Sequence, residues 1–380
     1  MRKTFIYTVL LVATGLSCST LRLDRPVTTG THDWLMYGGR MERTNATENA
    51  VVPPLSRAWT YDASSGFSPY SIALADSLLI IQNLQGEIRI VSAPDGRELG
   101  SRRFGTSVFG TPVLHDDTLY VALSRDATTV LAYNLRSAVI QWKLSAGDVE
   151  TSPLLMQNRL FVTTYEGKLL CISTSTGEIL WTYKVPESSQ PALIRSSPAG
   201  DGETVFFGCD DHKLYAVNAA DGSLRWSAAT RGSIVATPSV ADDKIFVGSL
   251  DSSLHAFNRS SGTLVWQRDL GSRIFGSQAV KNGYVYAGST GGDLFCLDAK
   301  TGTLVWTCYL NSILNAAPLV SDTVVYVGCG DKKMYAVSAA TGSLLWSSEL
   351  PGRVRGTPVA WNGFLFVLDD THTVTAFRQK

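Results

Sequence analysis

A tryptophan returns every forty-odd residues along this chain, and it closes nearly the same short phrase each time. The clearest copies are Thr176–Trp181, Asp221–Trp226, Ser261–Trp266, Thr301–Trp306 and Thr341–Trp346. The last four of these tryptophans are spaced by forty residues. A fixed period of this size is the signature of a repeat architecture, so it constrains the fold before any single residue does.

Other positions recur with the tryptophan. A glycine stands four residues before it, at Gly177, Gly222, Gly262, Gly302 and Gly342. Upstream, the copies have a Ser-Pro or Thr-Pro step or a variant of it, at Ser68-Pro69, Thr111-Pro112, Ser152-Pro153, Ser197-Pro198, Thr237-Pro238, Ala317-Pro318 and Thr357-Pro358, with Ser277-Gln278 in the sixth copy. Between these landmarks, short β-branched and aromatic runs such as Lys244–Ser249 and Ser253–Asn258 are typical of strands. Each copy therefore predicts four strands, which together make one propeller blade.

The repeat predicts an all-β fold, a single eight-bladed β-propeller of four-stranded antiparallel blades. Seven proline steps and Ser277-Gln278 give eight copies. The eighth copy ends at Lys380 without a tryptophan strand, whereas Leu55–Tyr61, which contains Trp59, precedes the first copy. We expect this N-terminal strand to complete the last blade and close the ring, because open sheet edges invite aggregation.

The repeat is broken in three places. Gly100 stands where the first blade should have its tryptophan, and Ser137-Ala138 replaces the Thr-Gly turn of the second. The interval from Trp181 to Trp226 is 45 residues, and its excess lies in Pro186–Pro198. Insertions in repeats fall in loops, often on the binding face. We expect this loop to expose three partner-binding residues: Leu193, Ile194 and Arg195.

Composition argues against nucleic acid as the partner. The 33 basic and 33 acidic residues give a net charge of zero, whereas nucleic-acid binding usually requires a basic surface. The chain has 380 residues, but a closed ring of this size is one domain.

The N-terminus is organised differently from the repeats. Residues 1–18 combine a basic start, an apolar stretch at Phe5–Ala13 and a small residue before Cys18, which resembles a bacterial lipoprotein signal in which Cys18 is lipidated. An ordinary secretion signal cleaved near the same place is the alternative. The apolar stretch is too short to span a membrane stably. We divide the chain into this signal, a tether and cap over 19–54 around Trp34 and Tyr37, and the propeller over 55–380.

The remaining chemistry-bearing residues give no catalytic pattern. Five cysteines remain besides Cys18, and an odd number argues against a complete disulfide framework. Cys171 and Cys296 occupy a repeat position held elsewhere by alanine, which predicts buried free thiols. The five histidines are dispersed, and the sequence has no HExxH, CxxC or GxSxG motif. We therefore predict no metal site, no catalytic residues and no cofactor.

Charged residues precede several of the proline steps. These segments lead into the innermost strands, so we expect their side chains around one mouth of the central channel. The candidates besides Arg195 are Arg273, Arg353, Arg355, Asp148 and Glu150. A charged mouth suits a polar partner or a peptide. A solvated rim without a partner is the alternative.

Taken together, these motifs resemble the PQQ-like propeller family over residues 56–380. One branch, the quinoprotein dehydrogenases, carries adjacent cysteines at its cofactor, and this chain has no Cys-Cys pair. The second branch, the BamB lipoproteins of the outer-membrane β-barrel assembly machinery, is similar in signal type, length, blade number and the loop at Pro191–Pro198. That resemblance implies lipidation of Cys18 and contact with a barrel subunit through Leu193, Ile194 and Arg195. Ser233–Ala236 lacks the acidic residues that BamB has before the next Thr-Pro step.

The sequence therefore favours a non-enzymatic, lipid-anchored scaffold that binds a protein partner in outer-membrane barrel assembly. We expect a monomeric outer-membrane lipoprotein that faces the periplasm. A PQQ-dependent dehydrogenase and a glycan- or peptide-binding envelope propeller are the alternatives.

Overall fold

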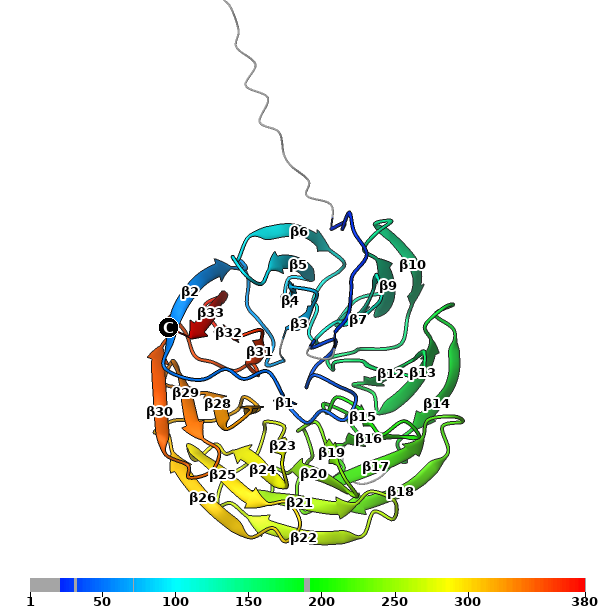
Figure 1. Ribbon diagram of the computed structural model, residues 1–380. Helices are drawn as coiled ribbons and strands as arrows, with labels where there is room; N and C mark the ends of the chain where they lie inside the picture. The colour runs from blue at the N-terminus through cyan, green and yellow to red at the C-terminus, as the bar shows by residue number, and fades with distance from the viewer. Residues whose placement is uncertain (1–20, 31–32, 71, 188–191, 380) are drawn as a thin grey trace, which may run out of the picture.

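The computed structural model describes residues 21–30, 33–70, 72–187 and 192–379. These residues form a ring of eight antiparallel sheets around a central channel, with no helix among them (Figure 1). The prediction of an all-β, eight-bladed propeller is confirmed.

Blades 1 to 8 are numbered along the chain, and their strands run from the channel outward. Blade 1 holds β3 (Ala73–Ala75), β4 (Leu78–Gln82), β5 (Glu87–Ser92) and β6 (Glu98–Arg103), and blade 2 holds β7 (Val113–His115), β8 (Thr118–Ala122), β9 (Val130–Asn134) and β10 (Val139–Leu144). Blade 3 holds β11 (Leu154–Met156), β12 (Arg159–Thr164), β13 (Lys168–Ser173) and β14 (Ile179–Lys184), and blade 4 holds β15 (Ala199–Gly200), β16 (Thr204–Gly208), β17 (Lys213–Asn218) and β18 (Leu224–Ala229).

The second half of the ring repeats this order. Blade 5 holds β19 (Ser239–Ala241), β20 (Lys244–Gly248), β21 (Ser253–Asn258) and β22 (Leu264–Asp269), and blade 6 holds β23 (Ala279–Lys281), β24 (Tyr284–Gly288), β25 (Asp293–Asp298) and β26 (Leu304–Tyr309). Blade 7 holds β27 (Leu319–Ser321), β28 (Val324–Gly328), β29 (Lys333–Ser338) and β30 (Leu344–Glu349), with β1 (Ala46–Thr47) parallel to β27. Blade 8 holds β31 (Val359–Trp361), β32 (Phe364–Leu368), β33 (Thr373–Gln379) and β2 (Leu55–Asp62).

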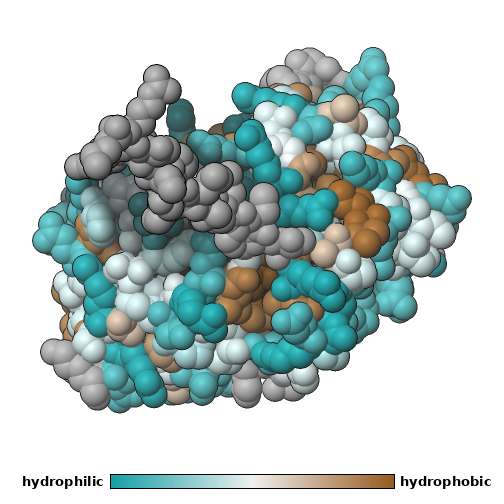
Figure 2. All heavy atoms as spheres, turned by 90° about the horizontal axis from the view of Figure 1, so that it is seen from above, coloured by the Kyte–Doolittle hydropathy of each residue, from teal (hydrophilic) through white to brown (hydrophobic). Residues whose placement is uncertain are grey.

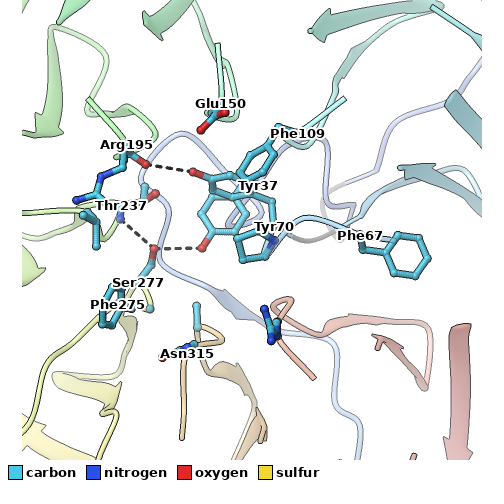
Figure 3. A pocket seen from close by; sticks show the side chains of 15 residues that line it. Tyr37, Phe67, Tyr70, Phe109, Glu150, Arg195, Thr237, Phe275, Ser277 and Asn315 are labelled. Atoms are coloured by element: carbon cyan, nitrogen blue, oxygen red, sulfur yellow. Dashed lines mark hydrogen bonds between the residues drawn. The ribbon is translucent and has the colours of Figure 1, made fainter. Parts of the chain in front are cut away.

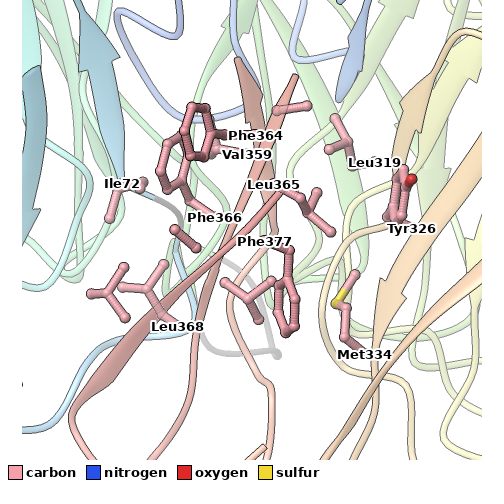
Figure 4. Close-up of a cluster of buried hydrophobic side chains, with 14 of the residues drawn as sticks. Ile72, Leu319, Tyr326, Met334, Val359, Phe364, Leu365, Phe366, Leu368 and Phe377 are labelled. Atoms are coloured by element: carbon pink, nitrogen blue, oxygen red, sulfur yellow. The ribbon is translucent and has the colours of Figure 1, made fainter. Parts of the chain in front are cut away.

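The ring closes in blade 8, as the sequence predicts. Strand β2 from the N-terminal side pairs antiparallel with β33, and Trp59 lies opposite Ala376. Phe366 and Phe377 belong to a buried cluster that joins this blade to its neighbours (Figure 4). Each fully buried phenylalanine contributes about 1.5–3 kcal/mol to the free energy of unfolding, so closure rests on apolar contacts as well as strand pairing.

The repeated tryptophan packs on the glycine turn of the next blade. A Cβ added to Gly302 would lie 2.6 Å from the ring of Trp266, and the backbone there has φ 70°, which glycine adopts without strain. The Trp266 indole also donates a 3.0 Å hydrogen bond to the carbonyl of Ala299. Seven such indole–carbonyl bonds occur among the described residues, from Trp59, Trp142, Trp181, Trp226, Trp266, Trp306 and Trp346. The spacing of forty residues therefore records a contact between neighbouring blades.

Among the described residues, only the junction of blades 1 and 2 lacks the indole–carbonyl bond, and two of the breaks in the repeat lie there. Gly100 pairs with Ile90 at the strand position that Trp181 holds opposite Cys171 in blade 3. In blade 2 the turn has Ala138 at φ 58° in place of glycine. Where no indole approaches, the turn does not require the open space that glycine provides.

The N-terminal segment plugs the channel. Trp34 and Leu74 exchange two backbone hydrogen bonds of 2.8 Å. Carbonyls farther along the segment accept bonds from the inner strands β7, β15, β19, β23 and β27, namely those of Leu35, Met41, Glu42, Thr44 and Asn45. The Trp34 indole donates to Ala360 of blade 8, and the Arg43 guanidinium to Pro153 at the entry to blade 3. The plug thus contacts all eight blades.

Candidate functional site at the channel mouth

The segments that enter the inner strands surround the open end of the channel. Each blade contributes one residue at an equivalent position. In most blades this residue stands three positions before the proline of the Ser-Pro or Thr-Pro step. These eight mouth residues are Pro69, Phe109, Glu150, Arg195, Val235, Phe275, Asn315 and Arg355, and all of them line one cavity. In blade 1 the inner strand begins at Ala73, so Ile72 holds the place of the proline. The equivalent of the Ser-Pro step in blade 1 is therefore Ser71-Ile72 in the sequence, three residues after the predicted Ser68-Pro69.

The cavity has a volume of about 340 Å³, and five of its fifteen lining residues are aromatic (Figure 3). Phe67 and Tyr70 come from the entry to blade 1, Phe109 from blade 2 and Phe275 from blade 6. The rings of Tyr70 and Phe109 meet edge to face, with centroids 6.0 Å apart. Such a cup presents apolar surface to a partner at the centre of a polar rim.

The floor of the cavity belongs to the plug. Tyr37 packs edge to face on Tyr70 at 4.9 Å, and its hydroxyl lies 3.1 Å from the hydroxyl of Ser277. Burial raises the pKa of both tyrosine hydroxyls, so they remain neutral donors. Tyr70 donates to the carbonyl of Arg195 at 3.3 Å. The mouth is therefore a blind cup rather than an open pore.

Arg43, a buried residue of the plug, links the floor of the cavity to blades 3 and 4. Its guanidinium is fully buried and donates to the carbonyls of Pro198 at 3.0 Å, Pro153 at 2.7 Å and Tyr37. Burial lowers the pKa of Arg43 to about 10, which leaves the side chain charged at neutral pH. A buried charge is tolerated only where several acceptors replace its water shell, and the three carbonyls do so.

The predicted mouth charges separate into two groups. Glu150 and Arg355 line the cavity, whereas Asp148, Arg273 and Arg353 are not among its lining residues. Asp148 accepts hydrogen bonds from the hydroxyl of Ser124 and the backbone of Arg125, both at 2.9 Å. Arg273 is exposed, and its carbonyl accepts a bond from Thr290.

Three arginines at or near the mouth face aspartates. Arg195 makes a bidentate contact with Asp210, at 2.9 and 2.8 Å, while two fifths of its side chain stay exposed. Arg353 donates to Asp370 from its backbone at 2.8 Å and its guanidinium at 2.7 Å, and Arg355 lies 3.9 Å from the same carboxylate. Burial alone would raise the pKa of Asp370, but these bonds hold it below its usual value. The guanidinium groups of Arg195 and Arg353 are therefore fixed in position.

One predicted contact residue is misplaced. Ile194 is 1% exposed and belongs to the core between blades 3 and 4, so the expectation that the loop exposes it is wrong. It holds the same repeat position as the buried Ile234 and Ile274. Leu193 is partly exposed and Arg195 is exposed, which leaves these two accessible. Pro191 and its three predecessors lie outside the described residues, as does Cys18.

The aromatic residues of the cup were missed by sequence reasoning. Phe109 and Phe275 occupy the repeat position of Arg195, so extending the alignment to this position could have found them. Tyr37 lies outside the repeat, and its partner Ser277 is 240 residues away. No sequence signal connects these two residues.

The prediction of buried free thiols at Cys171 and Cys296 is confirmed. The five cysteines within the described ranges are free, and all but Cys308 are buried. Burial raises the pKa of the Cys171 thiol to about 11 and that of Cys296 to about 12, so neither is a ready nucleophile. Within the same ranges, no three His, Cys, Asp or Glu side chains are grouped as metal ligands would be.

In the described part of the chain, no helix is long and apolar enough to cross a membrane. The ring, its tryptophan–glycine junctions and its plugged channel define an eight-bladed propeller of the PQQ-like class. The profile of the family described as outer membrane protein assembly factor BamB matches residues 84–251, 250–336 and 314–380. The chain belongs to this family.

Individual relatives are distant. The BamB of Yersinia pestis is 23% identical over 60% of this chain and 58% of its own length. A quinoprotein ethanol dehydrogenase of Pseudomonas aeruginosa is 28% identical over 26% of this chain and 17% of its own. The crystal structure of BamB from Moraxella catarrhalis superposes with a TM-score of 0.73 at 18% identity, over 85% of this chain and 99% of that one. The chain spans 12% to 58% of the length of the curated relatives it matches.

Proposed function

We propose that this protein is a non-enzymatic scaffold of the cell envelope, anchored through a lipid on Cys18, that binds a protein partner in outer-membrane barrel assembly. Membership of the BamB family supports this role. The periplasm-facing side of the outer membrane is the proposed location, and a subunit of the barrel assembly machinery is the proposed partner.

The observation that carries the proposal is the construction of the mouth. Eight residues, one from each blade, surround a cup with several aromatic side chains, and the two arginines among them, Arg195 and Arg355, face the carboxylates of Asp210 and Asp370. Aromatic and arginine side chains supply most of the binding energy at protein interfaces, and a rigid display reduces the entropy lost on binding. We assign partner contact to Arg195, which lines the cup, and to Leu193, two residues before it.

The test must separate partner contact from stability. Reversing the charge of Arg195 alone would leave Asp210, whose side chain is only 9% exposed, facing a like charge. The paired variant Arg195→Met with Asp210→Asn removes the rim charge and keeps the buried site neutral. We expect it to reduce co-purification of a barrel subunit from native membranes at least tenfold without a lower melting temperature. The matched pair Arg353→Met with Asp370→Asn, across the mouth, is the control.

Full recovery of the partner with the Arg195 pair would refute this contact. Equal losses with both pairs would assign binding to the whole rim instead.

A quinone-dependent dehydrogenase is the second candidate, favoured by the dehydrogenase match. The residues present do not fit that cofactor. The chain has no adjacent cysteines, and Tyr37 and Tyr70 form the floor of the mouth. Its two arginines, which would have to meet the cofactor carboxylates, already face Asp210 and Asp370. Adding PQQ and Ca²⁺ and recording the absorbance of the purified protein tests this, and a stoichiometric bound quinone would overturn the scaffold proposal.

A further inference from the structure

The first described residues fill the junction that lacks the tryptophan contact. Leu21 is completely buried in the cluster shared by blades 1 and 2, together with Ile90 and Tyr133. The Tyr133 hydroxyl donates to the carbonyl of Leu21 at 2.6 Å. Leu23 donates from its backbone to the carbonyl of Leu135 at 2.9 Å. The segment is therefore integrated into the propeller and is not a free tether at this point.

The segment follows the face opposite the mouth. After Leu23, Val27 donates to Asp117 at 2.8 Å and Thr28 to Asp76 at 3.1 Å, and these two carboxylates lie in the inner hairpin turns of blades 2 and 1. The chain then reaches Trp34 and the plug. In Figure 1 this blue segment passes between β6 and β10 and runs inward to the channel.

Arg102 completes the unusual junction. Its guanidinium donates to the carbonyl of Ala138 at 3.2 Å and lies 4.7 Å from the centre of the Tyr133 ring. Arg102 therefore contacts both Tyr133, whose hydroxyl holds Leu21, and the turn that lacks glycine. The missing indole and the docked N-terminal segment belong to one arrangement.

This docking restricts where a lipid on Cys18 can lie. Three residue steps separate Cys18 from Leu21, and an extended chain covers them in about 10 Å. We infer that the edge of blades 1 and 2 around the turns Ala93–Arg97 and Leu135–Val139 faces the lipid bilayer, on the side away from the mouth. This inference rests on the lipid anchor of the proposed function.

The orientation leaves the mouth accessible. Figure 2 views the edge of blades 1 and 2, where hydrophilic surface surrounds smaller apolar patches. Such a surface suits contact with lipid headgroups rather than insertion into hydrocarbon, because buried polar groups without partners are costly. Blades 5 and 6 lie across the ring from this edge (Figure 1). They would point into the aqueous space.

A matched pair of turn residues tests the orientation. The backbone N–H of Ser137 donates to Asn134 at 2.8 Å in blade 2, and that of Ser261 donates to Asn258 at 3.0 Å in blade 5, so both serines hold the same position in the same turn. A photoreactive diazirine residue placed at either position, in the full-length lipidated protein, reports proximity to lipid. The protein is reconstituted in vesicles of phosphatidylethanolamine and phosphatidylglycerol, and phospholipid adducts are measured by mass spectrometry.

We expect at least fivefold more lipid adduct at position 137 than at position 261. Inserting ten Gly/Ser residues after Thr20 should remove the preference, because the longer tether no longer fixes the edge to the surface. Equal adducts in the parent protein would overturn the orientation, as would a preference that survives the insertion. The mass of the N-terminal peptide separates the two proposals: an acylated Cys18 with equal adducts refutes only the orientation, whereas an unacylated Cys18 refutes the anchor as well.

Discussion

Replacing the turn glycine of blade 6 tests whether the tryptophan spacing records a contact between blades. In Gly302→Ala, the new methyl group would lie 2.6 Å from the ring of Trp266, which is 8% exposed. A positive φ of 70° adds a backbone penalty of about 1–2 kcal/mol for alanine. Overpacking a rigid buried ring costs about 1–3 kcal/mol more. We expect the free energy of unfolding to fall by about 2–5 kcal/mol.

Gly283 of the same blade is the matched control. It has φ 78°, and nothing lies within 4 Å of the position its Cβ would occupy. Gly283→Ala should therefore cost only the backbone penalty, about 1–2 kcal/mol. Urea unfolding followed by circular dichroism measures both variants. Equal losses for the two glycines would show that Trp266 imposes no restriction on the turn, and the contact explanation of the repeat would be wrong.

A double-mutant cycle sharpens the same argument. Trp266→Leu removes the ring, so adding Gly302→Ala to that variant should cost about 1–3 kcal/mol less than adding it to the parent protein. Additive losses would mean that the ring and the methyl group do not meet.

Three further predictions concern the plug and the buried titratable groups. Arg43→Met should lower the free energy of unfolding by about 3–5 kcal/mol, because three buried carbonyls lose their charged donor. Urea unfolding measures the loss, and Arg268→Met, at an exposed position, is the control. Burial lowers the pKa of His255 below 6.5 despite the nearby Asp251, so its stabilising contribution is complete above the unfolded pKa and is lost as pH falls through the folded one. The melting temperature of His255→Phe should accordingly depend less on pH below 6.5 than that of the parent protein, and an unchanged dependence would refute this assignment. Iodoacetamide should alkylate Cys308 first, since the other four described cysteines are buried; peptide mass spectrometry after brief exposure measures the order.

The fold was predictable because each blade repeats the same short sequence motifs. Strand runs, a positive-φ glycine and a tryptophan recur at fixed spacing, and Leu55–Tyr61 supplied the one strand that the last copy lacked. The plug was not predictable in the same way. Arg43 and the carbonyl of Pro198 are 155 residues apart, and neither belongs to a pattern that names the other. The plug is not part of the repeat, so the repeat pattern does not predict which blade residues it contacts.

The sequence predicted the position of Arg195 at the mouth but not the burial of Ile194 beside it. The longer interval between tryptophans predicts an exposed loop, but it does not distinguish Ile194 from its neighbours in that loop. Side chains entering the inner strand alternate between core and mouth, however, and Ile194 takes the core position. Comparison with Ile234 and Ile274 across the repeats would have placed it correctly, because a position that is always aliphatic faces the core.

The repeat positions of Ile194 and Arg195 differ in how strongly the fold restricts the residue type. The core position is valine, isoleucine or leucine in seven of the eight blades: Val108, Val149, Ile194, Ile234, Ile274, Leu314 and Val354. The next position holds proline, phenylalanine, glutamate, arginine, valine or asparagine. The core side chain must fill space against its neighbours, whereas the mouth side chain also borders the cavity, where residues of different size and charge can be accommodated. Within one ring, uniformity therefore marks residues that stabilise the propeller, and variety marks the surface that is free to recognise a partner. The same logic explains Ala138, which departs from glycine only at the junction where no indole requires it.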